Sequence, residues 1–154
     1  MKHQLYLSLG SNLGNRRFLL DEAVRLLGER VGVVVAVSSF IETEPWGFES
    51  EHSFLNVAVH LETEMEPLDV LVRTQQIERE LGRTRKSDDG TYHDRPIDID
   101  ILLYDDVRLD GEFTVSECVD GVPTDRRVHL TIPHPLMHER DFVMIPLREI
   151  LPEG

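Results

Sequence analysis

The stretch 53–63 alternates between two kinds of side chain, and this pattern constrains the fold more than any other part of the sequence. Its odd-numbered members are aliphatic, namely Leu55, Val57, Val59 and Leu61. Because residues two apart in a strand point to the same face, these four predict a face packed on a core. The even-numbered members include aromatic, amide and imidazole groups, so the opposite face is predicted to be a different environment.

Helical and strand-like segments alternate around this strand in a simple order. Two amphipathic helices are predicted at about 16–27 and 67–81, where apolar residues recur at helical spacing and Gly28 and Gly82 follow as end signals. Apolar and β-branched runs predict strands at 4–9, 31–43, 53–63 and 97–104. The order βαββαβ is typical of a ferredoxin-like α+β sandwich, an antiparallel sheet with helices packed mainly on one face.

Residues 105–130 follow the last of these strands and are rich in acidic side chains. Two Asp-Gly pairs, at 110–111 and 120–121, predict a hairpin there. We expect it to be a surface excursion from a single domain spanning 1–154, and its sequence indicates no role for it. A C-terminal helix is expected at about 141–150.

The charge balance argues against several classes of protein. The chain has 16 Lys and Arg against 29 Asp and Glu, a net charge of −13. Duplex nucleic acids and anionic membranes require a basic surface, so we expect neither as a partner. Cys118 is the only cysteine and cannot form an internal disulfide. With no apolar run long enough to span a membrane, we expect a cytoplasmic protein, and a monomer.

The most informative motif is Asp98-Ile99-Asp100, near the start of the strand 97–104. The two carboxylates share one face of the strand, while Ile99 and its apolar neighbours take the other. Two like charges on one face repel unless a cation lies between them, and a hard divalent ion such as Mg²⁺ takes oxygen ligands. The alternative is a solvent-facing side of an edge strand, although the apolar run after Asp100 indicates a buried strand.

Cationic residues flank this strand. Arg83 and Arg85 open the preceding loop, 83–96, and Arg95 closes it. Guanidinium groups beside two carboxylates are typical of a metal–polyphosphate site. A solvated loop whose cations pair with nearby aspartates is the alternative. Because the loop is polar and lacks an apolar stripe, we expect it to be mobile and to close over bound substrates.

Two further pairs of residues predict recognition of a flat ring and a nucleotide. Phe54 and Asn56 lie on the mixed face of the alternating strand, and an aromatic plane beside an amide suits a heterocycle. An ordinary second core face is the alternative. Gln75 and Glu78 continue the apolar stripe of the second helix, which indicates either a nucleotide contact or a solvated helix end.

Taken together, these segments resemble one enzyme family. The segments that carry the resemblance are Leu9-Gly10-Ser11-Asn12-Leu13-Gly14, Thr43-Glu44-Pro45-Trp46-Gly47, Phe54-Leu55-Asn56, Gln75-x-Ile77-Glu78, Gly82-Arg83-x-Arg85, Arg95-x-Ile97-Asp98-Ile99-Asp100-Ile101, Ile132-Pro133-His134-Pro135 and Arg140-x-Phe142. Over nearly its whole length the chain is similar to the 6-hydroxymethyl-7,8-dihydropterin pyrophosphokinases of folate biosynthesis. The resemblance implies transfer of pyrophosphate from ATP to the hydroxymethyl oxygen of the pterin, with release of AMP.

The resemblance also implies a role for each matching position. Asp98 and Asp100 would bind two Mg²⁺ ions, and Arg83 and Arg95 would be the catalytic cations. The pterin site would comprise Thr43, Trp46, Phe54, Asn56 and Phe142. The ATP site would comprise Gln75, Glu78, Arg85, Ile101, His129, Thr131, His134 and Arg140. No residue is implied as a general base.

Two other functions are compatible with the residues. One is another Mg²⁺-dependent, nucleotide-using enzyme on the same fold, which would not need Phe54, Asn56 and Phe142. The other is a non-catalytic binding module, which would not need the paired carboxylates. Release of AMP from MgATP, measured with and without the hydroxymethyl dihydropterin, separates the three.

Overall fold

The computed structural model of the chain describes residues 2–12, 15–43, 53–82, 97–119, 121–135 and 137–151. Its main sheet is antiparallel, with the strand order β2-β4-β1-β5 and β3 beside β4. The strands are β1 (His3–Ser11), β2 (Val33–Val37), β3 (Ile41–Thr43), β4 (Phe54–Thr63) and β5 (Asp98–Tyr104). This order is that of the predicted ferredoxin-like α+β sandwich.

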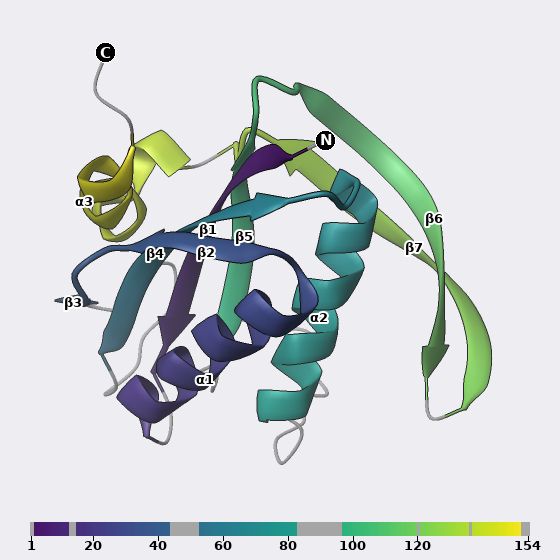
Figure 1. Ribbon diagram of the computed structural model, residues 1–154, viewed down its shortest axis with the longest axis horizontal. Coiled ribbons are helices and arrows are strands. Elements are labelled where there is room, and N and C mark those ends of the chain that lie inside the picture. Colours follow the sequence, from purple (N-terminus) through teal and green to yellow (C-terminus); the bar gives the residue numbers. More distant parts are fainter. Residues whose placement is uncertain are drawn as a thin grey trace.

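The helices of the described residues cover the two faces of the sheet unequally (Figure 1). Two of them, α1 (Arg16–Arg30) and α2 (Pro67–Gly82), lie side by side on one face, and α3 (Asp141–Ile150) lies on the other. A single turn of 3₁₀ helix, η1 (Met137–Glu139), precedes α3. Among the helices in the described ranges, none combines the length and the apolar character that crossing a membrane requires.

The alternation of side chains along the strands builds two apolar layers. Leu7 of β1 and Val57 of β4 are fully buried beneath α1 and α2. The opposite face is apolar only where α3 covers it, with Tyr6, Ala58 and Leu147 in that smaller cluster. The alternation predicted for 53–63 is therefore confirmed, and the second face is shared between a core and a polar region.

The first helix is longer than predicted. Gly28 does not end it, because the helix continues to Arg30 and is followed by Val31. A glycine inside a helix costs roughly 1 kcal/mol, which packing of the neighbouring buried turn readily offsets. Gly32, which follows the end of α1, has no room for a side chain, because a Cβ there would lie 2.1 Å from the carbonyl oxygen of Glu62.

The single strand predicted at 31–43 is wrong, because the structure divides it into β2 and β3. Both pair with β4, but the chain is interrupted at Ser38. Ser38 still donates its backbone N–H to the carbonyl oxygen of Ala58 at 2.9 Å, but the backbone N–H of Ala58 donates to Oγ of Ser38 at 2.8 Å, so a side chain makes one of the two bonds at this point. This break turns β3 along the end of β4 where Phe54 and Asn56 lie.

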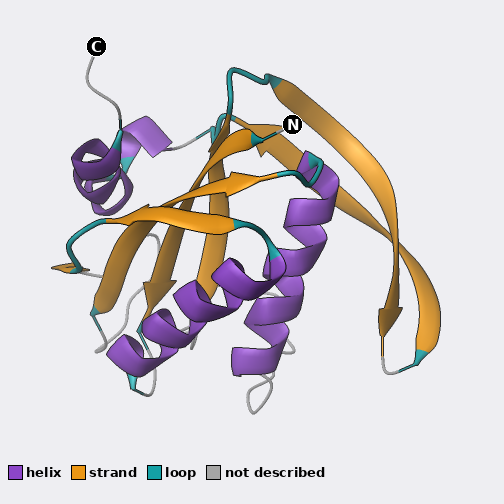
Figure 2. Cartoon of the chain, viewed as in Figure 1, coloured by secondary structure: helices purple, strands orange, loops and turns teal. Residues whose placement is uncertain are grey.

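The hairpin predicted at 105–130 consists of β6 (Leu109–Val119) and β7 (Val122–Ile132), two long strands that run past α2 (Figure 2). Gly121 has a φ of +80°, a conformation that favours glycine, whereas Asp110 and Gly111 lie within β6 and form no turn. One face of this hairpin packs inward, because Val115, Glu117, Val128 and Leu130 are all buried, while the residues between them lie on the exposed face.

Candidate active site

A row of three residues, here named the sheet row, crosses the sheet and ends at one of the predicted metal ligands. In the strand register, Gly10 of β1 lies opposite Asn56 of β4 and opposite Asp98 of β5. Residues directly opposite in antiparallel strands point to the same face, so the Asn56 amide and the Asp98 carboxylate share a face and are separated by roughly 10 Å of sheet. Asp100 follows on that face, opposite Ser8.

Gly10 keeps the middle of this row open. A Cβ on Gly10 would lie 2.9 Å from Oδ1 of Asn56 and 3.4 Å from Cδ1 of Phe54. The first of these distances is shorter than real Cβ contacts, so a side chain here would displace Asn56. Asn56 itself is buried, with 2% of its surface exposed. The predicted ring-binding residues therefore depend on a glycine in the neighbouring strand.

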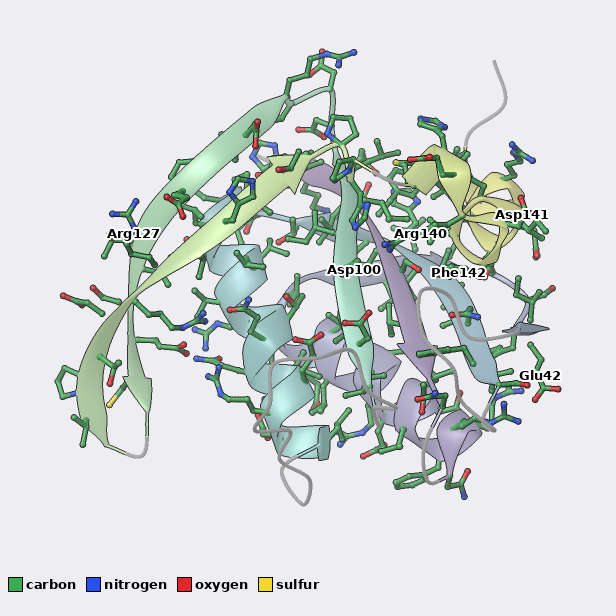
Figure 3. All side chains as sticks on the ribbon, turned by 180° about the vertical axis from the view of Figure 1, so that it is seen from behind. Glu42, Asp100, Arg127, Arg140, Asp141 and Phe142 are labelled. Atoms are coloured by element: carbon green, nitrogen blue, oxygen red, sulfur yellow. The ribbon has the colours of Figure 1, made fainter. Side chains whose placement is uncertain are left out.

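The start of α3 supplies side chains to the same side of the sheet. Figure 3 shows Arg140 and Phe142 on the side of the sheet on which Asp100 is seen on β5. The guanidinium carbon of Arg140 lies 5.6 Å from the ring centroid of Phe142, within the range of a cation–π contact. Phe142 is half-buried, so part of its ring stays accessible. Thr43 lies opposite Phe54 in the pairing of β3 with β4.

The open edge of β5 borders a cleft of about 350 Å³. Its walls come from α2, β5, β7 and the turn after β7. The residues that line it are Leu71, Gln75, Glu78, Asp98, Ile99, Asp100, Ile101, His129, Leu130, Thr131, His134 and Pro135. All the sequence-predicted metal ligands and six of the predicted ATP contacts are among them. The structure thus brings together residues that lie up to 59 positions apart, from Gln75 to His134.

Glu78 has a structural role in addition to the predicted one. Its Oε2 accepts the backbone N–H of Ile99 at 2.7 Å. Ile99 lies between the two aspartates on the edge strand β5, whose outer side has no neighbouring strand among the described residues. The carboxylate of α2 thus takes the place of a strand partner and holds the start of β5 in position.

Two histidines lie on the far wall of the cleft in different environments. His129 is mostly exposed, and its Nε2 lies 3.0 Å from Oγ1 of Thr131 and 3.1 Å from Oδ1 of Asp110. Burial lowers the pKa of His134, Arg140 lowers it further, and Asp98 opposes the shift. His134 is therefore held as a neutral imidazole near neutral pH, a state that can either donate or accept a hydrogen bond.

Several of the sequence-predicted residues lie outside the described residues. They are Trp46, Arg83, Arg85, Arg95 and the predicted lid at 83–96. Their roles stay predictions. The described part of the site is thus the floor and walls, without the cations that the resemblance assigns to catalysis.

Sequence reasoning missed Glu117 and Arg126, which form the most buried charged contact of the hairpin. The Glu117 side chain is only 3% exposed, and its Oε1 accepts Nε of Arg126 at 2.8 Å. A signal was available, because Arg126, Val128 and Leu130 alternate and must share a face. Val128 and Leu130 are apolar, so that face was bound to turn inward and carry Arg126 with it.

The donor set of the cleft fits Mg²⁺ bound together with a polyphosphate. Within the described ranges, no group of three or more His, Cys, Asp or Glu side chains is arranged to hold a metal ion. Asp98 and Asp100 line the cleft, and the only donor atoms that their side chains offer are oxygens. Mg²⁺ is commonly held by one or two carboxylates and completes its octahedron with water and phosphate oxygens. A pair of aspartates therefore matches an ion that arrives with its nucleotide.

The structure is a ferredoxin-like α+β sandwich whose edge cleft is lined by two aspartates, a glutamate, a glutamine and two histidines. The chain belongs to the family described as 7,8-dihydro-6-hydroxymethylpterin-pyrophosphokinase (HPPK), whose pattern matches residues 6–152. The match covers every described residue of the cleft and of the sheet row. The resemblance inferred from the sequence is thereby confirmed.

Similar proteins carry the same description. A 2-amino-4-hydroxy-6-hydroxymethyldihydropteridine pyrophosphokinase of Porphyromonas gingivalis is 51% identical over 148 residues, which cover 96% of this chain and 90% of that protein. An enzyme of the same name from Bacillus subtilis is 42% identical over 151 residues, 97% of this chain and 79% of that protein.

Solved structures show the same fold at low sequence identity. A wild-type HPPK-DHPS of Plasmodium falciparum matches 99% of this chain with a TM-score of 0.73 and 18% identity. Another HPPK-DHPS structure, in complex with substrates, matches with a TM-score of 0.74 and 17% identity. This chain spans about 40% of the length of each. Their likeness supports the assignment of the fold.

Proposed function

We propose that this chain transfers pyrophosphate from ATP to 6-hydroxymethyl-7,8-dihydropterin, yielding AMP and the pterin diphosphate, as a step of folate biosynthesis. The observation that carries the proposal is the shared face of Asn56, Asp98 and Asp100, separated by the bare backbone of Gly10. A ring bound at Asn56 and a polyphosphate bound at the aspartates would meet over this gap. Membership of the HPPK family and the names of the relatives support the same reaction.

ATP would lie in the cleft at the edge of β5. Gln75, Glu78, Ile101, His129, Thr131 and His134 line that cleft, and Arg140 lies beside His134. The neutral imidazole of His134 is suited to donate a hydrogen bond to a phosphate oxygen. Arg85 is proposed to contact ATP from the loop that follows α2.

The pterin would stack between Phe54 and Phe142. The edge of a flat ring placed there would face the Asn56 amide. An amide offers both a donor and an acceptor to a heterocycle. Thr43 and Trp46 are proposed to contact the same edge. Because Asn56 is buried, its hydrogen bonds would form in a site largely shielded from water.

Asp98 and Asp100 would hold two Mg²⁺ ions, which supply positive charge to the phosphate oxygens during transfer. Arg83 and Arg95 are proposed to neutralise the group in transit. These side chains position the reactants and stabilise charge, and no residue is assigned as a base. In the reaction the hydroxymethyl oxygen forms a bond to the β-phosphorus of ATP. The bond from that phosphorus to the oxygen that bridges it to the α-phosphorus breaks, so AMP leaves with that oxygen. The hydroxyl proton passes to solvent.

We further propose that residues 1–154 form one catalytic domain that acts as a monomer in the cytoplasm. ATP is available in the cytoplasm, which supports that compartment.

The experiment is a product analysis of MgATP incubated with the protein, with and without 6-hydroxymethyl-7,8-dihydropterin. We expect AMP and the pterin diphosphate to accumulate in equal amounts and only when both substrates are present. Release of ADP in place of AMP would contradict pyrophosphate transfer. Release of AMP without the pterin would instead identify a different acceptor.

A further inference from the structure

We propose that Arg126, on the returning strand of the hairpin, is a positioning residue that orients the amide of Gln75 toward the nucleotide. The inference rests on the proposed function, because Gln75 matters only if the cleft holds ATP. It assigns to the β6–β7 hairpin a role that the sequence did not indicate. The hairpin would set the hydrogen-bonding character of one wall of the ATP cleft.

Glu117 of β6 anchors the arrangement. Its Oε1 accepts Nε of Arg126 at 2.8 Å, while its Oε2 accepts Nη2 of Arg79 at 2.9 Å and Nε2 of Gln76 at 3.0 Å. Both oxygens of a buried carboxylate are thus occupied, and two of the donors come from α2. Charge-assisted bonds of this kind fix geometry more firmly than neutral ones. The hairpin is therefore fastened to α2 beside the cleft.

Arg126 extends from this anchor to the cleft. Its Nη2 donates to Oε1 of Gln75, whose side chain lines the cleft. A guanidinium can only donate, so the atom that faces it must be the amide oxygen of Gln75. The amide nitrogen then lies at the other end of the group, and Gln75 offers the cleft a donor. Its partner on the nucleotide would be an acceptor, either a ring nitrogen or a ribose oxygen.

The neighbouring Arg127 provides a matched control. Alternation along β7 turns Arg127 to the outer side, where its side chain is 69% exposed and pairs with Glu112 at 3.1 Å. Figure 3 shows it on the hairpin, directed away from the sheet. The two arginines lie on the same strand and each pairs with a glutamate of β6, Arg126 with Glu117 and Arg127 with Glu112. Only Arg126 also reaches a residue of the cleft.

The test measures steady-state kinetics of Arg126→Ala and Arg127→Ala. We expect Arg126→Ala to raise KM for MgATP by about five- to tenfold, the effect of one misplaced hydrogen bond, with KM for the pterin changed less than twofold. Arg127→Ala should leave both values within about twofold. An unchanged KM for MgATP in Arg126→Ala, or equal increases in both variants, would overturn the proposal.

A double-mutant cycle separates positioning from general support of the fold. If Arg126 acts through Gln75, adding Arg126→Ala to Gln75→Ala should raise KM for MgATP no further. A full additional increase would overturn the proposal. If Arg126→Ala does not fold, Arg126→Lys retains the charge but loses the two-armed geometry and should show the same rise.

Failure of the proposed function would be visible separately. A wild-type protein that forms no AMP with the pterin would reject that function before any variant is compared. Calorimetric binding of a non-hydrolysable ATP analogue would still test Arg126 in that case. Weaker binding in Arg126→Ala than in Arg127→Ala would support the positioning role, and equal binding would overturn it.

Discussion

Two parts of the candidate site are built in opposite ways. One is the sheet row, and the other is the wall of the cleft at Gln75, which Arg126 and Glu117 of the hairpin support and which we name the hairpin wall. The row of Asn56, Gly10 and Asp98 is set by strand register, and its spacing follows from the backbone of three adjacent strands. The wall beside Gln75 depends on side chains, with Arg126 and Glu117 joining separate elements. A backbone-defined half is fixed when the sheet forms, whereas a side-chain-defined half can change by single substitutions.

This difference suggests a division of labour. The reacting groups would be placed by the half that cannot shift without loss of the sheet. The affinity for the nucleotide would be set by the hairpin wall, whose geometry depends on a few charged side chains. Substitutions in the sheet row are therefore expected to affect the rate or the pterin, and substitutions at the hairpin to affect ATP affinity or stability.

The largest effect is expected for the aspartates. Asp98→Asn and Asp100→Asn should each lower kcat by roughly a hundredfold or more, because loss of a metal ligand removes several kcal/mol of stabilisation from the transition state. The variants should fold, as the β5 core residues are unchanged. Asp106→Asn, at an exposed position after the same strand, is the control. A kcat within about threefold of wild type in either variant would disprove the metal assignment.

A smaller effect is expected when the gap in the row is filled. Gly10→Ala places a methyl group 2.9 Å from Oδ1 of Asn56 and should weaken pterin binding about tenfold, in line with the usual cost of overpacking. Gly111→Ala is the matched control, since its Cβ would meet only the Phe113 ring at 3.6 Å. Pterin titrations of the two variants give the comparison. Equal affinities would mean that the row does not form the pterin site.

A third effect concerns stability and its dependence on pH. Burial alone would raise the pKa of Glu117, but bonds from Arg126, Gln76 and Arg79 lower it below its ordinary value of about 4.5. A carboxyl whose folded pKa is depressed stabilises the fold above its unfolded pKa and loses that contribution as pH falls through the folded value. Glu117→Gln should therefore be less stable than wild type at pH 7, by about 1–3 kcal/mol, and the difference should shrink below pH 4.5.

Denaturant unfolding at pH 7 and at pH 3.5 measures this difference. Glu112→Gln, on the exposed side of the hairpin, is the control and should change the free energy of unfolding by less than about 0.5 kcal/mol. A stability difference for Glu117→Gln that stays constant with pH would show that the Glu117 network does not stabilise the hairpin as a charged group.

Features that follow from side-chain alternation within one strand could be predicted from the sequence. Features that depend on contacts between separate elements could not. The alternation of 53–63 and the Asp98-Ile99-Asp100 motif gave the faces of β4 and β5 correctly. The end of α1 was misplaced because Gly28 competes with packing that no local signal records. At the break after Val37, Ser38 bonds through both its side chain and its backbone to Ala58, twenty residues away.

In the hairpin, the alternation of side chains predicts the inward face but not the partners of the charged residues on it. Its acidic composition suggested a solvated excursion, but Glu117 is neutralised by Arg79 of a helix 38 residues earlier in the chain. Only the fold brings these charges together. The pairing of Arg126 with Gln75 likewise joins residues 51 positions apart. Alternation along a strand therefore indicates which charged side chains turn inward, but their partners follow only from the arrangement of the other elements.

The central claim is that the pterin occupies the sheet row and ATP the edge cleft, and crossed calorimetric titrations of Asn56→Ala and Gln75→Ala test it most directly. A non-hydrolysable ATP analogue is titrated first, and the pterin is then titrated with the analogue near saturation. We predict that Asn56→Ala loses at least tenfold in pterin affinity and keeps its affinity for the analogue, whereas Gln75→Ala shows the reverse. Parallel losses for both ligands in both variants would contradict the account.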